Sequence, residues 1–599
     1  ATTNIANTEF SSNTVSGTDA AILRVNEANL NLSSSTIANN LFGETLIKAI
    51  TYSTVNISDS TFKNNSSSIR NYLIRADLSD LTVENTEFVN ENALSADSTL
   101  IVESHGNVSI KNSSFRGAQN LRAINIWGGL DTAKKAEISD SEISGFTGVG
   151  SGSAIMLGDK APNTNITNTK FTNNTSTFSA GAIFHYYSAG KLTIVDSTFA
   201  DNKAAEQGGA IYNESALDII SNAGKGTEFS GNTATNGGND IYNAYSSSVL
   251  TFLGDGETKI TGGIGGTGQI IKNESGTLSL KGENSGFTGT TNIEAGKILF
   301  DKTAAADSYL GGVTTINNGG TLEFKLAVDD TLAAGALAGT GDFLKTGSAT
   351  LTVTGDNSAF DGKTTISDGK ILFISDSDDD KYFSGTTEIA ESKELVYQTD
   401  IESDFSAILS GSGILRKTGS ETLNVTGAQD AFAGNVQIDA GKLLFGYNSA
   451  ADSFFGGTTT VNNGGELEYN ASIDGNLDSD IVGTGTFSKT GAGTTSLLGQ
   501  NDGFTGVVNV KEGVLAFSEE TNKSFFGSDE INVGAQADKT AKLDYTFNYD
   551  NEFVKNVNLT GNGTFLNNAA NGSVVTISGN VAMSGENNLL QYSGGTFVF

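Results

Sequence analysis

The sequence predicts an all-β fold, a single long right-handed parallel β-helix (solenoid), on three observations. Apolar residues recur at short regular intervals, not in helical stripes. A short phrase returns every 25–30 residues or so in the first part of the chain, and a longer unit of about 72 residues returns in the rest. Fixed periods of this kind are typical of solenoids. We therefore expect a β-helix of short repeats over 1–250, and one of long repeats over 251–599 with three rungs in each.

The short repeat is marked by phrases such as NTEF, DSTF and NTKF that end on an apolar anchor. The anchors are Phe10, Ile37, Phe62, Phe88, Phe115, Ile143, Phe171, Phe199 and Phe229. Alternating apolar and polar residues precede each anchor and predict a strand with one inward face. A second short strand is predicted from Ala21, Ala154, Ala182 and Ala210. If each repeat is one turn, the phenylalanines should stack in one buried column.

An asparagine follows three residues after six of the nine anchors. These residues are Asn13, Asn40, Asn65, Asn174, Asn202 and Asn232. Asparagine tolerates the left-handed conformation of a tight turn, and its amide can bond to the same amide one turn away. The fixed offset therefore predicts an asparagine ladder, with these residues in the turn.

Two tetrapeptides in this region carry a family resemblance. FxxN occurs at Phe10, Phe62, Phe171, Phe199 and Phe229; GGAI occurs at Gly208, and AGAI at Ala180 is a near match. This pairing resembles the FxxN and GGA[ILV] repeats of the polymorphic outer-membrane proteins, a family of autotransported adhesins. The resemblance implies a β-helical passenger that is exported to the cell surface.

The long repeat runs from Gly266 to Phe300 and returns at Gly339, Gly411 and Gly483, with a degenerate fifth version from Gly561. The interval from Phe300 to Phe324 is one third of this unit, which suggests three rungs in each module. The repeat closely resembles the passenger-associated transport repeat of autotransporters. That resemblance implies export through an outer-membrane β-barrel, which we expect to lie outside this sequence, and a role of the repeat in folding during secretion.

Composition excludes several classes of function. The chain has no Cys, which excludes disulfides, Cys-ligated zinc and thiol catalysis. Its net charge of −33 repels phosphate backbones, so we expect no nucleic-acid partner. No segment has the length and apolarity of a membrane span or signal peptide, so we expect a mature chain or a fragment that continues beyond its ends or associates end to end.

The sequence offers few residues for catalysis. There are two histidines, His105 and His185, and no GDSG or GxSxG motif. The blocks of pectin-cleaving β-helices are missing, apart from Ser104-His105-Gly106. His185 lies in AIFHYYS, and we expect it to be a solvent-side strand residue. We assign no catalytic, cofactor-binding or metal-binding residue, and no cofactor.

The densest acidic cluster is Asp376, Asp378, Asp379 and Asp380 in ISDSDDDKYF. It lacks the glycine and terminal glutamate of a calcium loop, so we expect a solvated loop between rungs. Strands that are distant in the sequence align in a solenoid, however. A catalytic acid and base on two such strands therefore remain an open alternative. A groove that gathers two or more carboxylates with a basic residue would favour catalysis.

These observations favour an exported cell-surface passenger that acts as an adhesin, autoaggregation factor or surface structural element, and not as an enzyme. Expected partners are a receptor or glycan on a host or neighbouring cell, or the chain itself. It would meet a membrane only through the translocator barrel, and lie at the bacterial cell surface or be secreted, associated with the outer membrane. The alternative is a β-helical carbohydrate-active enzyme, either a polysaccharide lyase or a tailspike-like depolymerase.

Overall fold

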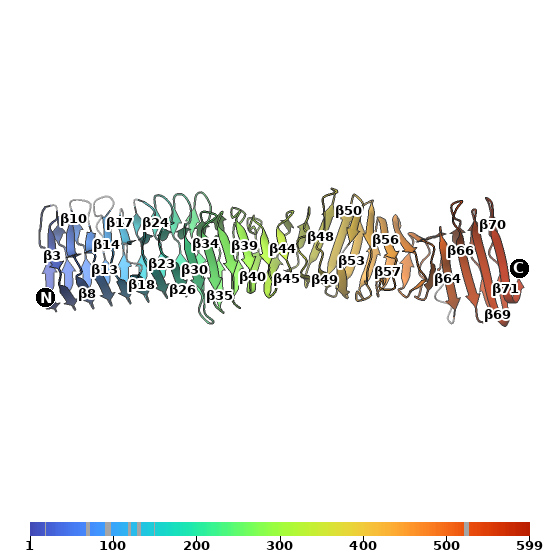
Figure 1. Cartoon of the computed structure of the whole chain (residues 1–599), viewed down its shortest axis with the longest axis horizontal. Helices are drawn as coiled ribbons and strands as arrows, with labels where there is room; N and C mark the ends of the chain where they lie inside the picture. Colours follow the sequence, from blue (N-terminus) through green and yellow to red (C-terminus); the bar gives the residue numbers. More distant parts are fainter. Residues whose placement is uncertain are drawn as a thin grey trace. The chain divides into compact units, whose positions relative to one another are not determined.

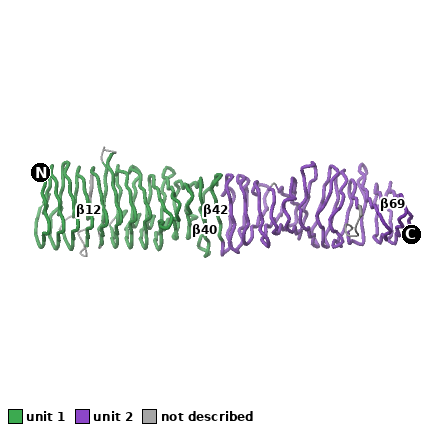
Figure 2. Tube along the Cα trace, turned by 90° about the horizontal axis from the view of Figure 1, so that it is seen from below, with its two compact units in different colours: residues 1–325 green, residues 326–599 purple. Residues whose placement is uncertain are grey.

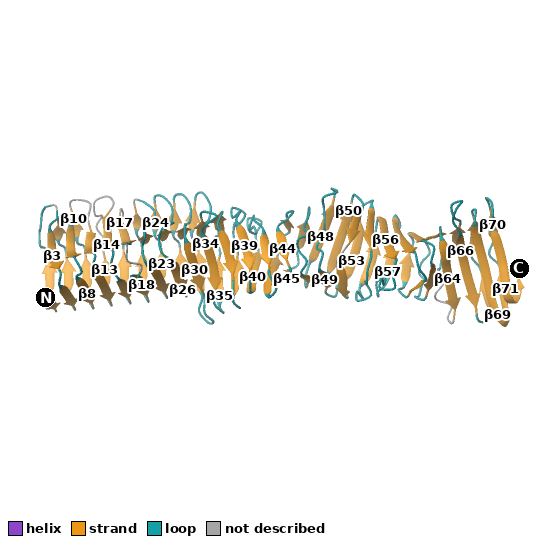
Figure 3. Cartoon of the chain, viewed as in Figure 1, coloured by secondary structure: helices purple, strands orange, loops and turns teal. Residues whose placement is uncertain are grey.

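A computed structural model describes residues 1–17, 19–67, 72–89, 98–117, 121–128, 133–148, 150–405, 407–519 and 526–599. Throughout these ranges the regular structure is β-strand, without helix (Figure 3). The chain divides into two compact units, Ala1–Lys325 and Leu326–Phe599 (Figure 2). Each unit is a solenoid of stacked parallel strands, which confirms the predicted fold class. The boundary near residue 250 between the short repeats and the long repeats stays a prediction.

In unit 1 the chain winds through three stacks of parallel strands (Figure 1). The first stack runs from β1 (Thr2–Ala6) to β41 (Thr314–Ile316), and the second, the anchor stack, from β2 (Glu9–Ser11) to β40 (Gly296–Lys302). The third is the ten-stranded sheet from β3 (Ala21–Asn26) to β36 (Ile264–Gly266). This sheet contains the predicted second short strands.

The anchors form the predicted buried column. Ring centroids are 4.8 and 4.6 Å apart along Phe62, Phe88 and Phe115. A second run of three rings, with spacings of 4.8 and 4.7 Å, consists of Phe171, Phe199 and Phe229. Ile37 and Ile143 occupy the same register positions, and Phe10, which pairs with Ile37, is half-buried. Equal sequence spacing has thus become vertical alignment, because each repeat is one turn.

The asparagine ladder is confirmed, with one correction. Amide Nδ2 to Oδ1 distances are 2.9 Å from Asn13 to Asn40, 2.8 Å from Asn40 to Asn65, 3.0 Å from Asn174 to Asn202 and 2.9 Å from Asn202 to Asn232. The left-handed turn residue is the one before each ladder asparagine, as at Asn39 (φ 54°) and Asn173 (φ 56°). The prediction that the ladder residue itself adopts this conformation was wrong, because its amide must point inward to reach the next turn.

Unit 2 shows that a module is longer than three turns. Along β45 (Asp342–Thr346), β47 (Lys363–Ile366), β49 (Thr386–Ile389) and β52 (Ile408–Gly411), the register joins Lys345 to Ile366, Ile366 to Ile389 and Ile389 to Gly411. Three turns therefore lead from Lys345 only as far as Gly411. Lys417, the equivalent of Lys345, lies further along the chain, in β53 (Ile414–Thr418) of the neighbouring sheet. The expectation of three rungs to a module was wrong: a module is three turns plus a step of one sheet.

A buried lysine occupies the same place in each module. Lys345, Lys417 and Lys489 point inward, and each Nζ donates to two carbonyls of the following turn and one of the next solenoid turn, at 2.6–3.2 Å. Burial lowers the pKa of each ammonium group to about 8. These lysines satisfy carbonyl groups that strand pairing leaves over.

Candidate binding surface

The outer face of the ten-stranded sheet changes its chemistry along unit 1. One outward column of side chains is aligned by the register of β3, β7 (Thr45–Ile50), β11 (Tyr72–Asp77), β17 (Leu121–Trp127), β21 (Ile155–Leu157), β25 (Ile183–His185), β29 (Ile211–Asn213) and β33 (Ile241–Asn243). It contains Arg24, Lys48, Arg75, Asn125, Met156, Phe184, Tyr212 and Tyr242, with β14 (Ser98–Ser104) joining β11 to β17 in the same register. The column is cationic at its start and aromatic at its end.

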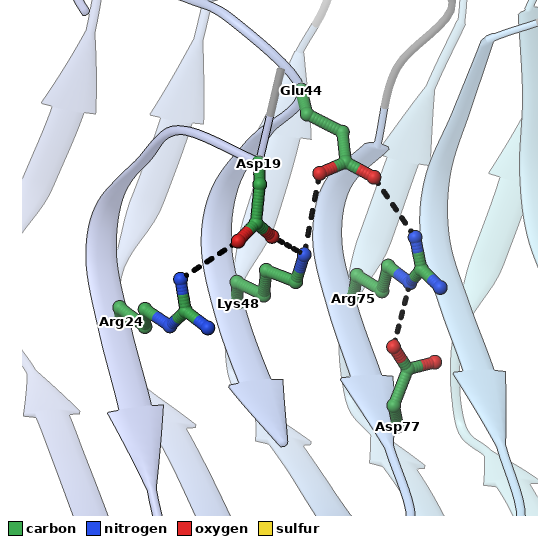
Figure 4. A network of polar contacts seen from close by, with 6 residues as sticks. All are labelled: Asp19, Arg24, Glu44, Lys48, Arg75 and Asp77. Atoms are coloured by element: carbon green, nitrogen blue, oxygen red, sulfur yellow. Dashed lines mark hydrogen bonds and ion pairs between the residues drawn. The ribbon is translucent and has the colours of Figure 1, made fainter. Parts of the chain in front are cut away.

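The cationic part is neutralised by its neighbours (Figure 4). Asp19 binds both Arg24, at 3.0 Å, and Lys48. Glu44 bridges Lys48, at 3.2 Å, and Arg75, at 3.0 Å. Contact with the Lys48 ammonium and then the Arg24 guanidinium holds the pKa of Asp19 below its usual value. Three like charges in register would repel, so the bridging carboxylates give this end of the sheet a structural role.

The aromatic part is a stack of parallel rings. Phe184 and Tyr212 lie 5.2 Å apart at an interplanar angle of 3°, and Tyr212 and Tyr242 lie 5.5 Å apart at 9°. Their three residues are half-exposed, whereas the isoleucine before each of them is buried. Rings in this arrangement are held by their neighbours above and below, so they present a rigid edge to solvent.

The turns after β25 and β33 and the end of β17 add more aromatic side chains. Tyr187 is 60% exposed and Tyr245 49%, and Trp127, the last residue of β17, is 38% exposed. Tyr186 lies against Tyr187 at 4.4 Å between ring centroids. We call this set the aromatic surface: Trp127, Phe184, Tyr186, Tyr187, Tyr212, Tyr242 and Tyr245. Soluble proteins rarely expose so many large apolar groups on one face unless it binds a partner.

A carboxylate lies within the aromatic surface. Glu214 accepts hydrogen bonds from the backbone N–H of Tyr187, at 3.1 Å, and from the hydroxyl of Tyr245, at 3.2 Å. Burial raises the pKa of this carboxyl group. Nearby, the Ser188 hydroxyl donates to Asp159 at 2.5 Å. The surface thus combines apolar area with fixed polar groups, the combination found in recognition sites.

The prediction for His185 was wrong. His185 is buried, with Nδ1 at 2.7 Å from Asn213 Oδ1 and Nε2 at 2.8 Å from the Gly190 carbonyl oxygen. Burial lowers the pKa of the imidazole. Alternation along β25 places Phe184 outward and His185 inward, in register with Asn213. His105 lies at an exposed turn after β14 (Ser98–Ser104). In the described part of the chain, no group of three or more His, Cys, Asp or Glu side chains could hold a metal ion.

The acidic cluster forms the predicted solvated loop. Asp376, Asp378 and Asp379 are exposed. Asp380 accepts hydrogen bonds from the backbone N–H groups of Asp376, at 2.9 Å, and Ser377, at 3.0 Å. Asp452, one module later, accepts from Asn448 and Ser449 in the same way, at 2.8 Å each. The carboxylate at this position therefore closes the turn.

Beside this turn, unit 2 has a recess of about 470 Å³ that sequence reasoning missed. Its lining includes Asp378, Asp380, Lys381, Glu402 and Asp404. Two or more carboxylates with a basic residue are the composition that we set as favouring catalysis. The signal was present in the sequence, since the spacing of one solenoid turn brings Glu402 and Asp404 near the preceding acidic turn, but only the three-dimensional structure shows the hollow.

Comparison with known proteins identifies the repeats. Residues 270–299, 343–372, 415–445 and 487–517 match the family described as passenger-associated-transport-repeat. The chain is similar to the adhesin BmaC autotransporter of Brucella suis biovar 1 (strain 1330), with 31% identity over 148 residues that cover 20% of this chain and 4% of that protein. These matches support an autotransporter passenger that carries transport repeats.

A second relative is the uncharacterized lipoprotein YdeK of Escherichia coli (strain K12). It is 24% identical over 299 residues, which cover 50% of this chain and 20% of that protein. The chain therefore spans a fifth or less of the length of these curated relatives. Within the described ranges, no helix has the length and apolarity to cross a membrane.

Proposed function

We propose that this passenger acts as an adhesin at the bacterial cell surface, and that the aromatic surface of unit 1 contacts its partner. One observation carries the proposal: seven aromatic side chains lie half-exposed or exposed on one side of a rigid sheet. Tyrosine and tryptophan supply large contact area at low entropic cost, so they are enriched where proteins bind partners. The similarity to a protein named as an adhesin supports the same function.

The partner is a receptor or glycan on another cell, or a second passenger. A chain of net charge −33 repels acidic partners at long range. The cations of Figure 4 are already paired with carboxylates, so that end of the sheet offers no open basic patch. Apolar contact and hydrogen bonding at the tyrosines are therefore the main source of affinity.

The test compares cells that display the whole passenger. Tyr187→Asn together with Tyr245→Asn should lower adhesion or autoaggregation roughly tenfold, as expected when aromatic contacts of this kind are removed. Tyr52→Asn is the matched control, because Tyr52 is 81% exposed and lies outside the aromatic surface. Equal surface display of all variants is required. Undiminished adhesion by the double variant would refute the assignment to this surface.

A second candidate function is that of a carbohydrate-active enzyme, which the acidic recess favours. Replacement of Asp376, Asp378, Asp379 and Asp380 by Asn would remove half of the recess's carboxylates. We expect the passenger to release no sugars from a broad panel of polysaccharides before or after the change. Turnover that disappears in the variant, with circular dichroism unchanged, would establish the enzyme instead.

A further inference from the structure

The outward column of unit 1 has two different ends at equal distances from its middle. The column occupies every strand of the ten-stranded sheet except the last, β36, and so spans nine turns. Asn125 in β17 holds the fifth position. Cations hold the first three positions, from Arg24 to Arg75, and aromatic rings the last three, from Phe184 to Tyr242.

Such a column is able to pair with a second copy of itself. When two copies face each other about a twofold axis along β17, the first position of one copy lies opposite the ninth position of the other. Arg24 then faces Tyr242, Lys48 faces Tyr212 and Arg75 faces Phe184 of the second copy. The same three contacts recur at the other end. The two halves match in spacing, because each has one side chain per solenoid turn.

The two ends have complementary hydrogen-bonding groups. The rings of Tyr212 and Tyr242 stack on their neighbours face to face, so their edges are directed to the solvent. A tyrosine hydroxyl can donate to a carboxylate or accept from a guanidinium group. At the other end the side chains of Arg24 and Asp19 are 49% and 56% exposed, and that of Arg75 is 30% exposed. Both kinds of partner are therefore within reach of a second copy.

Charge also favours an approach through this column. A net charge of −33 makes copies of the chain repel each other at long range. At the cationic end, however, the three cations are matched by the three carboxylates of Figure 4. The other named positions of the column, from Asn125 to Tyr242, are uncharged residues, with Glu214 as a carboxylate beside them. Repulsion between two copies is therefore weak along this face.

The area of the face is sufficient for a dimer. Nine strands that are ~4.8 Å apart make a face about 40 Å long. The strands have three to seven residues, or about 16 Å on average at ~3.3 Å per residue. Each copy would cover roughly 600 Å², and the pair about 1,200 Å², which is at the lower end of the range for specific interfaces.

Trp127 lies at the position of the twofold axis. It follows Asn125 by two residues in β17, so the two side chains share the outer face of the sheet. Trp127 is 38% exposed and is the one tryptophan of the chain. An axis along β17 brings the two Trp127 rings of a pair together at the centre of the interface, where large aromatic side chains contribute most to association.

We propose that unit 1 forms an antiparallel dimer through this column, in which the aromatic end of each copy binds the cationic end of the other. This rests on the proposed function, because it names a second copy of the chain as the partner of the aromatic surface. A parallel pair is disfavoured, since it would place Arg24, Lys48 and Arg75 opposite the same three cations.

The first experiment uses the unchanged full chain. Sedimentation velocity should show a monomer and a dimer in exchange between about 1 and 100 µM, the weak end of what interfaces of this size give. The fluorescence emission of Trp127 should shift to shorter wavelength over the same range, because its ring leaves water. A chain that is still monomeric at about 100 µM would overturn the proposal, as would a dimer whose Trp127 emission does not change.

The second experiment tests the antiparallel arrangement with two double variants. The cation variant is Arg24→Gln with Arg75→Gln, and the ring variant is Tyr212→Ser with Tyr242→Ser. Symmetry counts each change twice, so a set of contacts worth about tenfold in affinity makes either variant dimerise about a hundredfold more weakly. An equal mixture keeps one intact set, and its mixed dimer should be only about tenfold weaker than the wild-type dimer.

Arg116→Gln is the matched control, because Arg116 is an exposed cation on the anchor stack, and it should leave dimerisation unchanged. A mixture that associates no better than its two parents would refute the antiparallel pair. So would a cation variant that dimerises like the wild type. If cells with the cation variant adhere normally while cells with Tyr187→Asn and Tyr245→Asn do not, the adhesin assignment stands and the second copy is not its partner.

Discussion

Removal of one ladder asparagine should open several turns of unit 1. Asn202 is fully buried, and its Oδ1 accepts from the backbone N–H of Asn174, at 3.1 Å, and from its amide, at 3.0 Å. Its Nδ2 donates to the Phe171 carbonyl oxygen and to Asn232 Oδ1, both at 2.9 Å. Asn202→Ala removes four buried hydrogen bonds. At about 1 kcal/mol each, the loss is about 4 kcal/mol of local stability.

Hydrogen exchange of the full chain, read by mass spectrometry, measures this loss locally. A solenoid opens turn by turn, so a global unfolding midpoint would average the effect over many repeats. A loss of about 4 kcal/mol corresponds to exchange roughly a thousandfold faster in β23 (Lys170–Thr172), β27 (Thr198–Ala200) and β31 (Thr227–Ser230). Asn165→Ala, at an exposed strand position of unit 1, is the control and should change exchange less than about threefold. An acceleration below about tenfold for Asn202→Ala would show that the ladder contributes little to stability.

Three further predictions concern unit 1. Phe199→Ala removes a buried ring stacked on both sides and should cost about 3–5 kcal/mol of local stability, read by hydrogen exchange in β27, against less than about 1 kcal/mol for the exposed Phe178→Ala. Burial raises the pKa of Asp240 to about 6, so the folded state binds this proton more tightly than the unfolded state. Stability should therefore fall by about 3 kcal/mol as the pH rises from about 4 to 7, and Asp240→Asn should remove that slope. Gly208→Ala places a Cβ 2.3 Å from a backbone oxygen at φ 67°, and should cost more than Gly224→Ala, which has a similar φ but open space.

The sequence predicts those side-chain contacts that depend only on the number of residues in one solenoid turn. Translation by one turn brings Phe171 over Phe199, and Asn174 over Asn202, whatever the path of the chain between them. The same reasoning would have found the aromatic stack, since Phe184, Tyr212 and Tyr242 recur along the sequence at the same spacing as the last three anchors.

Side-chain direction near a strand end could not be predicted as well. A shift of one residue reverses every side chain of a strand, and the position of His185 depended on that choice. The recess was harder still, because it requires a turn that projects and a strand of the following solenoid turn beneath it. No periodicity in the sequence reports how far the turn at Asp380 extends from the sheet.

The true length of a module also limits what the two recesses can do together. Because each module adds one sheet to three full turns, equivalent residues of successive modules lie on different sheets of unit 2. The recess beside Asp380 lies over β51 (Ser403–Phe405) and β54 (Thr422–Val425) of one sheet. A second recess one module later, lined by Asp452, Asp474 and Asn476 among others, lies over β59 (Gly475–Leu477) and β62 (Thr494–Leu497) of another. Avidity requires that linked ligands reach both sites at once, and a ligand that follows one sheet cannot do so. One ligand that follows a single sheet can therefore contact only one of the two recesses, whereas the tyrosines of unit 1 stay in register along one sheet.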